Sequence, residues 1–413
     1  MRILILTAAY PPEIRSASHL MAELAQGLAE RKHEVAVVTP APAYNLADGA
    51  PRSKRRLIMV SVESKVKVAR VWTARFQMVG PVARGLAQLT LPFAVAAGGM
   101  WTGAADVILV YSPPLTMAVG ALFLGRLKGA PYVLNVQDLF PQNAIDLGVL
   151  RGRLPIGFYR SMESRVYKRA AAITVHSEGN CRVVRAGVAN PSRVTVVRNW
   201  VDLESYRTAG NGASFRSRHE LEGVFLVLFA GVMGYAQDLD TVLEAARRLK
   251  SNREIVFLLV GDGVEKAALM RKAQAAGIGN VRFMNWVSQE AYPELVAAVD
   301  VGLVTLRKSM KTPVVPSKLL GYMAAGKPVV SSLNSESDAI PIIDESGCGF
   351  NVDVESPDAM AEAIEKLWKS PESARGMGER GRAYALAHFS RTRAVDDYEW
   401  ILRNCANQRW RET

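Results

Sequence analysis

Short aliphatic runs alternate with longer amphipathic segments along the first half of the chain. The runs Arg2–Thr7 and Glu34–Thr39 are typical of buried strands, and the segment between them carries Leu20, Leu24 and Leu28 at helical spacing. The same order recurs, with strands expected at 106–111, 131–137 and 172–176 and helices expected up to 127 and over 159–170. This alternation predicts βαβ crossovers and a parallel sheet covered on both faces.

A second series of the same kind occupies the second half of the chain. Strands are expected at Phe225–Ala230, Ile255–Val260, 281–283, 301–304 and 328–331, with helices over 239–250, 264–276 and 317–325. The polar segment Thr208–Arg218 separates the two series. We therefore predict an α/β protein with two Rossmann-like, doubly wound domains facing across a cleft, at 1–207 and 219–385, joined by a linker at 208–218.

The composition sets limits on this picture. With 413 residues, 49% of them hydrophobic and 22% charged, the chain can bury two cores and is neither disordered nor fibrous. Its three cysteines are odd in number and widely spaced, which argues against a disulfide framework or a zinc site and favours a reducing cytoplasm.

Neither the N-terminal run nor the most apolar stretch of the chain is expected to be a targeting or membrane-spanning segment. The N-terminal run is too short for a signal sequence, and Leu86–Trp101 is shorter than the roughly 20 residues that span a bilayer. No transmembrane helix is expected. Residues 386–413 are expected to be helical and to pack back on the body through Tyr398, Trp400 and Leu402.

The net charge of +12 favours anionic partners. One basic cluster is Arg52, Lys54, Arg55 and Arg56, and a second is Arg151, Arg153, Arg160, Arg165, Lys168 and Arg169; between them, the stretch 70–101 mixes arginines with aromatic and aliphatic residues. Two interpretations stay open: peripheral contact with an anionic membrane, or a core helix with solvated arginines. Nucleic acid is not expected, because no nucleic-acid-binding module is present.

The loops that follow strands are where a doubly wound sheet binds ligands. Neither a GxGxxG after the first strand nor a P-loop motif occurs. The loop with Gly231 and Gly234, and the turn Gly261, Asp262, Gly263, bring backbone near this edge, although such a turn is also ordinary. In VPSKLLGYMAAGKPVV, the residues Pro316, Ser317 and Lys318 combine a helix start, a hydroxyl and a cation, which suits a diphosphate; the alternative is a plain capped helix.

Several segments in consistent order carry a family resemblance from Arg2 to about Tyr384: YPPE, HEVAVVT, VQDLFP, VVRNWVDLESY, LLVGDG and YMAAGKPVV. The chain resembles the family 4 retaining glycosyltransferases of the GT-B fold, and within them the fucosamine-transferase-like enzymes of bacterial O-antigen and exopolysaccharide synthesis. The resemblance implies transfer of a sugar from a nucleotide diphosphate donor, expected to be a UDP-sugar and with an N-acetylated 6-deoxyhexose as one option. The donor would bind the second domain, and a lipid-linked or saccharide acceptor the first.

The chain departs from the family pattern at several positions. The glutamate pair that holds the ribose falls on Pro313 and Gly321, and the cations that bind the diphosphate fall on Val232 and Gln237. Lys318 is expected to supply the charge, with Arg15 and Ser16, which stand where the family has glycines, as further donor contacts. The chain is thus either an active variant or a silent sugar-nucleotide binder, with an epimerase or hydrolase as a weaker alternative.

The remaining candidates are assigned by position in the resembling pattern. Trp286 and Val287 are expected near the nucleobase, and Asp338 near the ribose. Asp138 is the candidate base for the acceptor hydroxyl, with Glu13 and His176 as further acceptor-side candidates, although a retaining enzyme of this fold does not strictly need a protein base. We expect no metal or other cofactor, since Asp238 and Asp240 are explained as the start of a helix. The expected location is cytoplasmic, with peripheral membrane contact.

Overall fold

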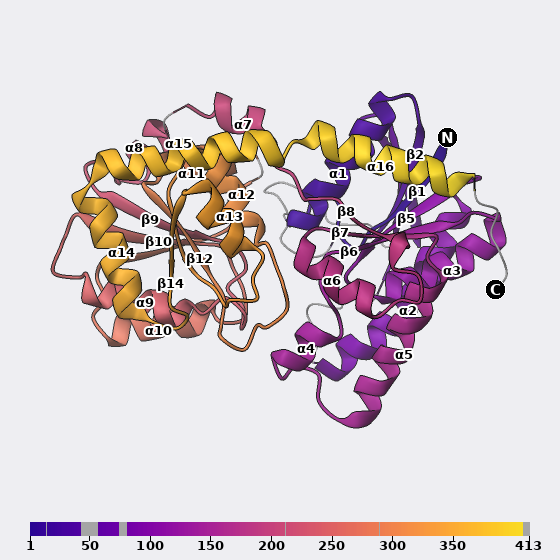
Figure 1. Ribbon diagram of the computed structural model, residues 1–413, viewed down its shortest axis with the longest axis horizontal. Coiled ribbons are helices and arrows are strands. Elements are labelled where there is room, and N and C mark those ends of the chain that lie inside the picture. The colour runs from indigo at the N-terminus through magenta and orange to yellow at the C-terminus, as the bar shows by residue number, and fades with distance from the viewer. Residues whose placement is uncertain (14, 43–56, 74–80, 211, 289, 408–413) are drawn as a thin grey trace. The chain divides into compact units, whose positions relative to one another are not determined.

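The computed structural model describes residues 1–13, 15–42, 57–73, 81–210, 212–288 and 290–407, with the backbone alone for 81–88. The chain divides into two units (Figure 1). Unit 1 comprises Met1–Asn199 and Arg391–Thr413, and unit 2 comprises Trp200–Ser390. The chain therefore passes from one unit to the other twice.

Unit 1 is built on an eight-stranded sheet with the order β3-β4-β2-β1-β5-β6-β7-β8. Neighbouring strands are parallel except for the antiparallel pair β3 and β4. The strands are β1 (Arg2–Leu6), β2 (Glu34–Pro40), β3 (Ile58–Glu63), β4 (Val66–Val71), β5 (Val107–Ser112), β6 (Tyr132–Val136), β7 (Ala172–Val175) and β8 (Val194–Val196). The helices are α1 (Ser16–Glu30), α2 (Pro81–Met100), α3 (Thr116–Lys128), α4 (Gln142–Asp146), α5 (Arg153–Arg169), α6 (Glu178–Ala186), the 3-10 turn Pro191–Arg193 and α16 (Arg391–Ala406).

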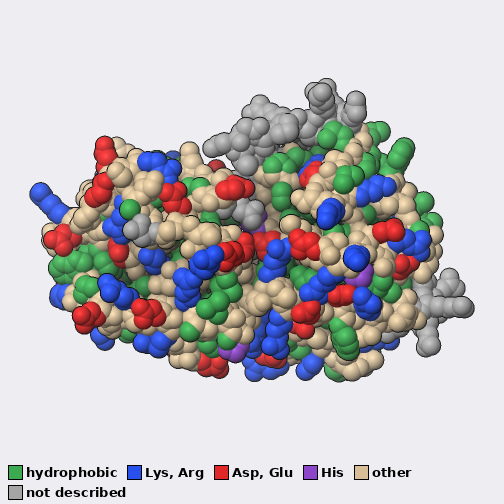
Figure 2. Space-filling model, turned by 90° about the horizontal axis from the view of Figure 1, so that it is seen from above, with side chains coloured by type: hydrophobic (Ala, Val, Ile, Leu, Met, Phe, Trp, Pro, Cys, Tyr) green, Lys and Arg blue, Asp and Glu red, His purple; other side chains and the backbone are tan. Residues whose placement is uncertain are grey.

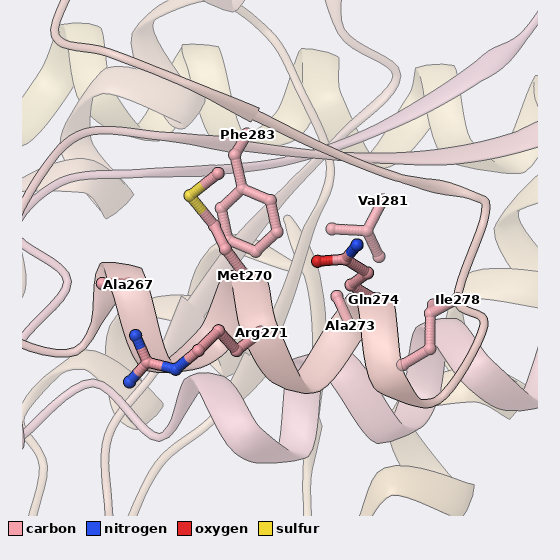
Figure 3. Close-up of a pocket in the computed structure, with 8 residues that line it drawn as sticks. All are labelled: Ala267, Met270, Arg271, Ala273, Gln274, Ile278, Val281 and Phe283. Atoms are coloured by element: carbon pink, nitrogen blue, oxygen red, sulfur yellow. The ribbon is translucent and has the colours of Figure 1, made fainter.

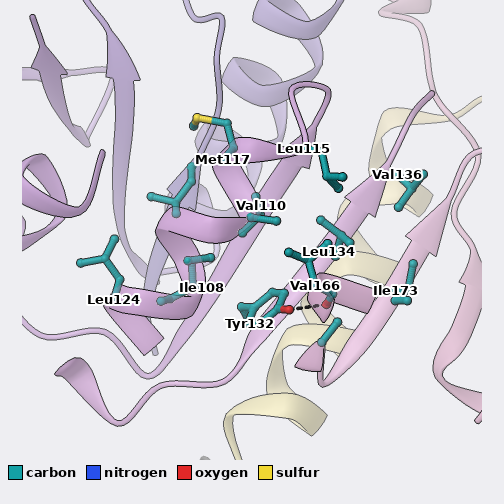
Figure 4. Packing of buried hydrophobic residues seen from close by; sticks show 14 of the residues in the cluster. Ile108, Val110, Leu115, Met117, Leu124, Tyr132, Leu134, Val136, Val166 and Ile173 are labelled. Carbon is teal, nitrogen blue, oxygen red and sulfur yellow. Dashed lines mark hydrogen bonds between the residues drawn. The ribbon is translucent and has the colours of Figure 1, made fainter. Parts of the chain in front are cut away.

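The core of unit 1 lies where helices cover the central strands. Every residue of β5 and β6 is buried, as their continuous apolar sequences require for strands covered on both faces. Figure 4 shows Leu124 of α3 and Val166 of α5 beside the side chains of these strands. Tyr132 adds its ring to this core and donates its hydroxyl proton to the backbone oxygen of Val166, so its polar end is satisfied.

Unit 2 has a six-stranded, wholly parallel sheet with the order β11-β10-β9-β12-β13-β14. Its strands are β9 (Phe225–Ala230), β10 (Ile255–Val260), β11 (Val281–Met284), β12 (Val301–Thr305), β13 (Val329–Ser332) and β14 (Gly349–Val352). Its helices are α7 (Leu203–Thr208), α8 (Ala213–Arg218), α9 (Leu239–Arg248), α10 (Lys266–Ala275), α11 (Tyr292–Ala298), α12 (Ser317–Ala324), α13 (Ala339–Ser346), α14 (Pro357–Lys369) and α15 (Pro371–His388). Two doubly wound α/β domains are thus present, as the sequence predicted.

The boundaries of the units differ from the predicted ones. The segment predicted as a linker contains α8, whose Phe215 is buried in the core of unit 2, and the chain leaves unit 1 already at Asn199. At the other end, α16 returns to unit 1 and buries Tyr398 and Leu402, which lie four residues apart on one face. Trp400 lies between them on the opposite side and is 66% exposed, so its predicted packing role is wrong.

Among the described residues, no helix combines the length and the apolar character needed to cross a bilayer. The apolar stretch that ends at Trp101 belongs to α2, which packs against α3 instead.

Candidate functional site

The predicted donor-binding residues of unit 2 lie in loops and at the start of helix α12, at one edge of its sheet. Since all six strands are parallel, their carboxyl ends meet at this edge. The residues that follow these ends are Gly231 and Gly234 after β9, Gly261 to Gly263 after β10, Trp286 and Val287 after β11, Pro316 to Lys318 after β12, and Asp338 after β13.

The loops after β9 and β10 contact each other through their backbone atoms. A Cβ atom added to Gly261 (φ +141°) would lie 1.9 Å from the oxygen of Gly231, and one on Gly263 (φ +157°) would lie 2.3 Å from the oxygen of Met233. The amide of Met233 also donates to the oxygen of Asp262 at 2.8 Å. Side chains at these two glycines would force the loops apart, so the glycines are needed for the fold whether or not a ligand binds.

Helix α12 begins at Ser317, directly at this edge. Pro316 occupies the N-cap position with an extended backbone and forms no side-chain cap hydrogen bond. Ser317 is therefore the first helical residue and not the N-cap residue. The free amides of the first turn still point out of this end of the helix.

Lys318 lies at the centre of the arrangement. Its ammonium nitrogen donates to Oε1 of Gln237 at 2.7 Å and lies 4.7 Å from the ring centre of Phe229. The same nitrogen lies 3.6 Å from the position of a Cβ atom on Gly231. Gln237 stands where the family has a cation, so Lys318 brings a positive charge to this position from another element.

Lys318 carries a charge that lacks a carboxylate partner among the described residues. Desolvation by the surrounding protein lowers its pKa from 10.5 to about 8. Within the described part of the chain, no carboxylate forms an ion pair with it, and its two contacts, Gln237 and Phe229, are neutral. A partly buried ammonium beside neutral groups and a helix N-terminus favours binding of an anion.

The position of the missing ribose glutamate is occupied by another side chain. A Cβ atom on Gly321 would lie 2.9 Å from the hydroxyl oxygen of Tyr206 in α7. The tyrosine ring therefore fills the space where the glutamate side chain would begin. Asp338 is the N-cap residue of α13, and its role at the ribose stays a prediction.

A second lysine, not predicted from the sequence, joins the loops after β10 and β11. The ammonium of Lys266 donates to the oxygens of Gly261 and Met284 at 2.8 and 3.1 Å and to Oδ1 of Asn285 at 2.7 Å. The next residue, Trp286, buries its indole N–H with no acceptor among the described residues, whereas Val287 packs against the core. Stacking of Trp286 on a nucleobase stays a prediction.

Asp238 and Asp240 start helix α9, as expected. Asp238 is its N-cap residue with φ 47°, is only 4% exposed, and has a pKa raised to about 6 by burial. The carboxylate of Asp240 is paired with Lys272 at 2.5 Å and with Arg307 at 3.3 Å. Asp240 therefore already has cationic partners, and burial favours the neutral form of Asp238.

In unit 1, the predicted acceptor-side residues also follow the carboxyl ends of strands. Glu13 is 8% exposed, and its Oε2 lies 3.6 Å from Nε of Arg15. Arg15 is the N-cap residue of α1 and Ser16 its first residue. Arg15 thus pairs with Glu13 of its own unit, and its contribution to donor binding stays a prediction.

His176 and Asp138 follow the neighbouring strands β7 and β6. The His176 ring is buried, and its Nε2 lies 3.0 Å from the backbone oxygen of Gln137 and 2.9 Å from the amide nitrogen of Asn180. The side chain of Gln137 forms a reciprocal amide pair with Asn199, at 2.7 and 3.0 Å. Asp138 is exposed, the nearby protein raises the pKa of its carboxyl group, and its role as the base for an acceptor hydroxyl stays a prediction.

A shallow hollow of about 520 Å³ lies between α10 and the edge strand β11 (Figure 3). Figure 3 shows Met270 and Phe283 at this hollow, with Arg271 at its margin. None of the predicted site residues lines it. Its position beneath a helix, and not at the carboxyl ends of the strands, separates it from the site built on Lys318.

Two family models match the chain. The model described as glycosyl transferases group 1 matches residues 213–384, and the model described as glycosyl transferase 4-like domain matches residues 17–200. The chain belongs to the family 4 glycosyltransferases of the GT-B fold. The two matches together account for both units of this glycosyltransferase.

Individual relatives and solved structures agree with this assignment. One relative, provisionally named the glycosyltransferase WbjE of Pseudomonas aeruginosa, is 28% identical over 63% of this chain and 66% of WbjE. Another, provisionally named the colanic acid biosynthesis glycosyl transferase WcaI of Escherichia coli K12, is 26% identical over 90% of this chain and 93% of WcaI. Anabaena HepE, solved with UDP and glucose, superposes with a TM-score of 0.72 at 15% identity, covering 98% of this chain and all of that one. WaaG, a glycosyltransferase of lipopolysaccharide biosynthesis, gives a TM-score of 0.71 at 16% identity over 97% and 99%.

Proposed function

We propose that this glycosyltransferase transfers a hexosyl or N-acetylaminodeoxyhexosyl group, with retention of configuration, from a nucleoside diphosphate to a lipid-linked or saccharide acceptor during the synthesis of a bacterial surface polysaccharide. The observation that carries the proposal is the ammonium of Lys318, held at 2.7 Å by Gln237 beside the N-terminus of α12. UDP is the expected nucleotide.

The chemistry requires stabilisation of a leaving nucleoside diphosphate. Lys318 and the first-turn amides of α12 supply a positive charge and hydrogen-bond donors for the diphosphate. Gly231 and Gly261, in the loops beside them, have no side chains, so the backbone there is open to a ligand. No metal is needed for this role, since Asp240 is already paired with Lys272 and Arg307. In unit 1, Asp138 orients or deprotonates the acceptor hydroxyl.

The names of the relatives support this choice of substrates. WcaI is named for colanic acid biosynthesis, the P. aeruginosa relative WbpZ is named a D-rhamnosyltransferase, and HepE was solved with UDP. Each of these statements concerns that protein. Transferred to this chain as a proposal, they favour a polysaccharide product and a uridine nucleotide.

A lipid-linked acceptor would bring the enzyme to a membrane surface, and α5 fits such a contact. Leu154 and Phe158, one helical turn apart, are 87% and 51% exposed. Five of the six charged residues of α5 are basic, and the exposed Arg151 precedes the helix. Apolar side chains that enter the headgroup region beside arginines and lysines are typical of peripheral binding to anionic lipid.

In the predicted stretch 70–101, Trp72, Phe93 and Trp101 are 53%, 67% and 66% exposed, but Arg70 is buried and paired with Glu63. Arg52, Lys54, Arg55 and Arg56, together with residues 74–80, lie outside the described residues. On the face drawn in Figure 2, lysines and arginines are interspersed with aspartates and glutamates over both units. We therefore assign the membrane contact of the proposal to α5.

The test is a transfer assay with a UDP-sugar and undecaprenyl-diphosphate-linked saccharides. Release of UDP together with an extended lipid-linked glycan is the expected result, and proton NMR of the new linkage should show the anomeric configuration of the donor. Binding of UDP-sugars without turnover would instead support a silent binder. Release of free sugar, or conversion of one UDP-sugar into another, would support a hydrolase or an epimerase.

A further inference from the structure

Strand β3 forms one end of the sheet of unit 1. Among the described strands, β4 is its only neighbour, so the other side of β3 is a free edge. The amide of Trp72 donates to the oxygen of Leu57 at 2.8 Å, and these two residues continue the antiparallel register by one step. Since bonded and non-bonded pairs alternate along such a ladder, the N–H and C=O groups of Ile58, Val60 and Val62 point away from β4.

The side chains at this edge are apolar and uncharged. Leu57, Val60 and Val62 are 78%, 45% and 76% exposed. The one charged residue of the strand, Glu63, is paired with Arg70 of β4 at 2.5 Å. Proteins usually protect a free edge with a lysine, a proline or a β-bulge, but β3 contains neither residue type and its register with β4 is continuous. Such an edge can pair with a further strand.

We propose that β3 pairs antiparallel with β3 of a second copy of this chain, so that the two eight-stranded sheets join across a two-fold axis. An axis perpendicular to the sheet makes the two copies of one strand antiparallel and brings the same surface against itself. The edge suits its own copy because the only charge of β3 is already neutralised within the chain, so no like charges meet. A lipid surface would leave the outward N–H and C=O groups without partners.

The outward groups also determine the register of the two strands. A pairing centred on Val60 places Val60 opposite Val60 and Ile58 opposite Val62, so all three outward residues form bonded pairs. A slip of two residues leaves one of them without a bonded partner inside the strand. In the centred register the opposing side chains are all β-branched and aliphatic, which stabilises a sheet.

Sedimentation velocity of the full chain over a range of concentrations tests the proposal. The wild type should be a dimer of about 90 kDa, twice the 45.0 kDa of the chain, at about 10 μM and should dissociate on dilution. Val60→Lys places two ammonium groups opposite each other and should raise the dissociation constant at least about tenfold, whereas Val60→Thr should keep it within about threefold. Val183→Lys is the matched control, because it makes the same change at a valine of α6 that is 46% exposed, and it should leave the dissociation constant unchanged.

Cross-linking tests the register. In the centred pairing the two Val60 side chains are neighbours, so a short bis-maleimide reagent should link Val60→Cys between copies but should not link Val183→Cys. The native cysteines are buried and should not react in the folded protein. Hydrogen exchange of the wild type adds a measurement without a variant: the amides of Val60 and Val62 should be protected in the dimer and exchange faster after dilution.

Three outcomes would overturn the inference. A wild type that stays monomeric at every concentration, with these amides exchanging freely, excludes the second copy. A monomer whose Val60 amide is protected would place another segment of the same chain on this edge. A dimer that Val60→Lys leaves intact would use another surface. Melting temperatures identify any variant that does not fold, and the exchange and cross-linking measurements then decide.

Discussion

Replacement of Lys318 by methionine should weaken donor binding without weakening the fold. From the structure, we expect the substitution to lower the affinity for the donor but to leave the free energy of unfolding unchanged or higher. The ammonium lacks a carboxylate partner among the described residues, and its pKa is lowered from 10.5 to about 8. A shift of 2.5 units corresponds to about 3.4 kcal/mol that opposes the charged form in the folded protein. Because the side chain is partly exposed, water screens part of this cost.

The sign of the stability effect follows from the direction of the shift. The charged lysine lowers the free energy of unfolding by its full amount below pH 8, where Lys318 is protonated in both the folded and the unfolded protein. This destabilisation disappears as the pH rises towards 10.5. Methionine carries no charge, so the variant should be about 1 to 3 kcal/mol more stable than wild type at pH 7, less the contacts to Gln237 and Phe229. Its melting temperature should equal or exceed that of the wild type.

The effect on binding has the opposite direction. A charge-assisted hydrogen bond to phosphate contributes about 1.5 to 3 kcal/mol, so the affinity for UDP should fall about 10- to 100-fold in Lys318→Met. Lys308→Met removes the same charge from an exposed position between β12 and α12 and serves as the control. Its affinity should change less than about threefold, since salt screens exposed charges.

Proton uptake offers an independent measurement. Burial lowers the pKa of Lys318 to about 8, and a bound diphosphate favours the charged form, so UDP binding should take up protons near pH 8 and fewer protons at pH 7. Calorimetry in buffers of different ionisation enthalpy measures this uptake. Unchanged UDP affinity in Lys318→Met would refute the assignment of Lys318.

Three further predictions concern other parts of the protein. Asp238→Asn should stabilise the protein by up to about 3 kcal/mol at pH 7 and not at pH 4. The reason is that burial raises the pKa of Asp238 from 3.8 to about 6 and so opposes its charged form. Thermal melts of the variant and the wild type at both pH values measure the difference. Transfer activity should survive excess EDTA, since Asp240 is paired with cations, and a complete loss restored by Mg²⁺ or Mn²⁺ would contradict a metal-free mechanism. Co-sedimentation with anionic vesicles should be strong at low salt and weaker at 0.5 M salt. It should drop in the double variant Leu154→Ser, Phe158→Ser but not in Met270→Ser, which removes an apolar side chain from α10. Equal and negligible binding to anionic and zwitterionic vesicles would exclude the contact through α5.

The sequence pattern was sufficient wherever a strand is buried on both faces. Phe225–Ala230 and Ile255–Val260 were predicted to the residue, because an uninterrupted apolar run between polar turns has few other interpretations. The hairpin of β3 and β4 gave no such signal, since Ile58–Glu63 is only partly buried and belongs to an antiparallel edge. Phe215 was missed because one apolar residue in a polar segment has no periodicity.

The candidate site was predictable in its parts but not in its contacts. Lys318 was found because a proline, a serine and a lysine mark a helix start after a strand. Its partner Gln237 is 81 residues away in the chain, and only the packing of the loop before α9 against helix α12 brings them together. The same holds for Lys266, whose three oxygen partners come from two loops, and for the pair of Gln137 and Asn199. Such hydrogen bonds depend on distances between elements, which a local pattern does not contain.

The two passages of the chain between the units bear on how the protein is made. All residues of unit 2 leave the ribosome before α16, whereas unit 1 receives its last helix only after unit 2 has been synthesised. Until then the side of unit 1 that Val395, Tyr398 and Leu402 will cover is open, including the apolar contact of Val395 with Gly27. A nascent chain that stops before Arg391 therefore carries a complete second unit and an unfinished first one, which would expose apolar surface to chaperones and proteases.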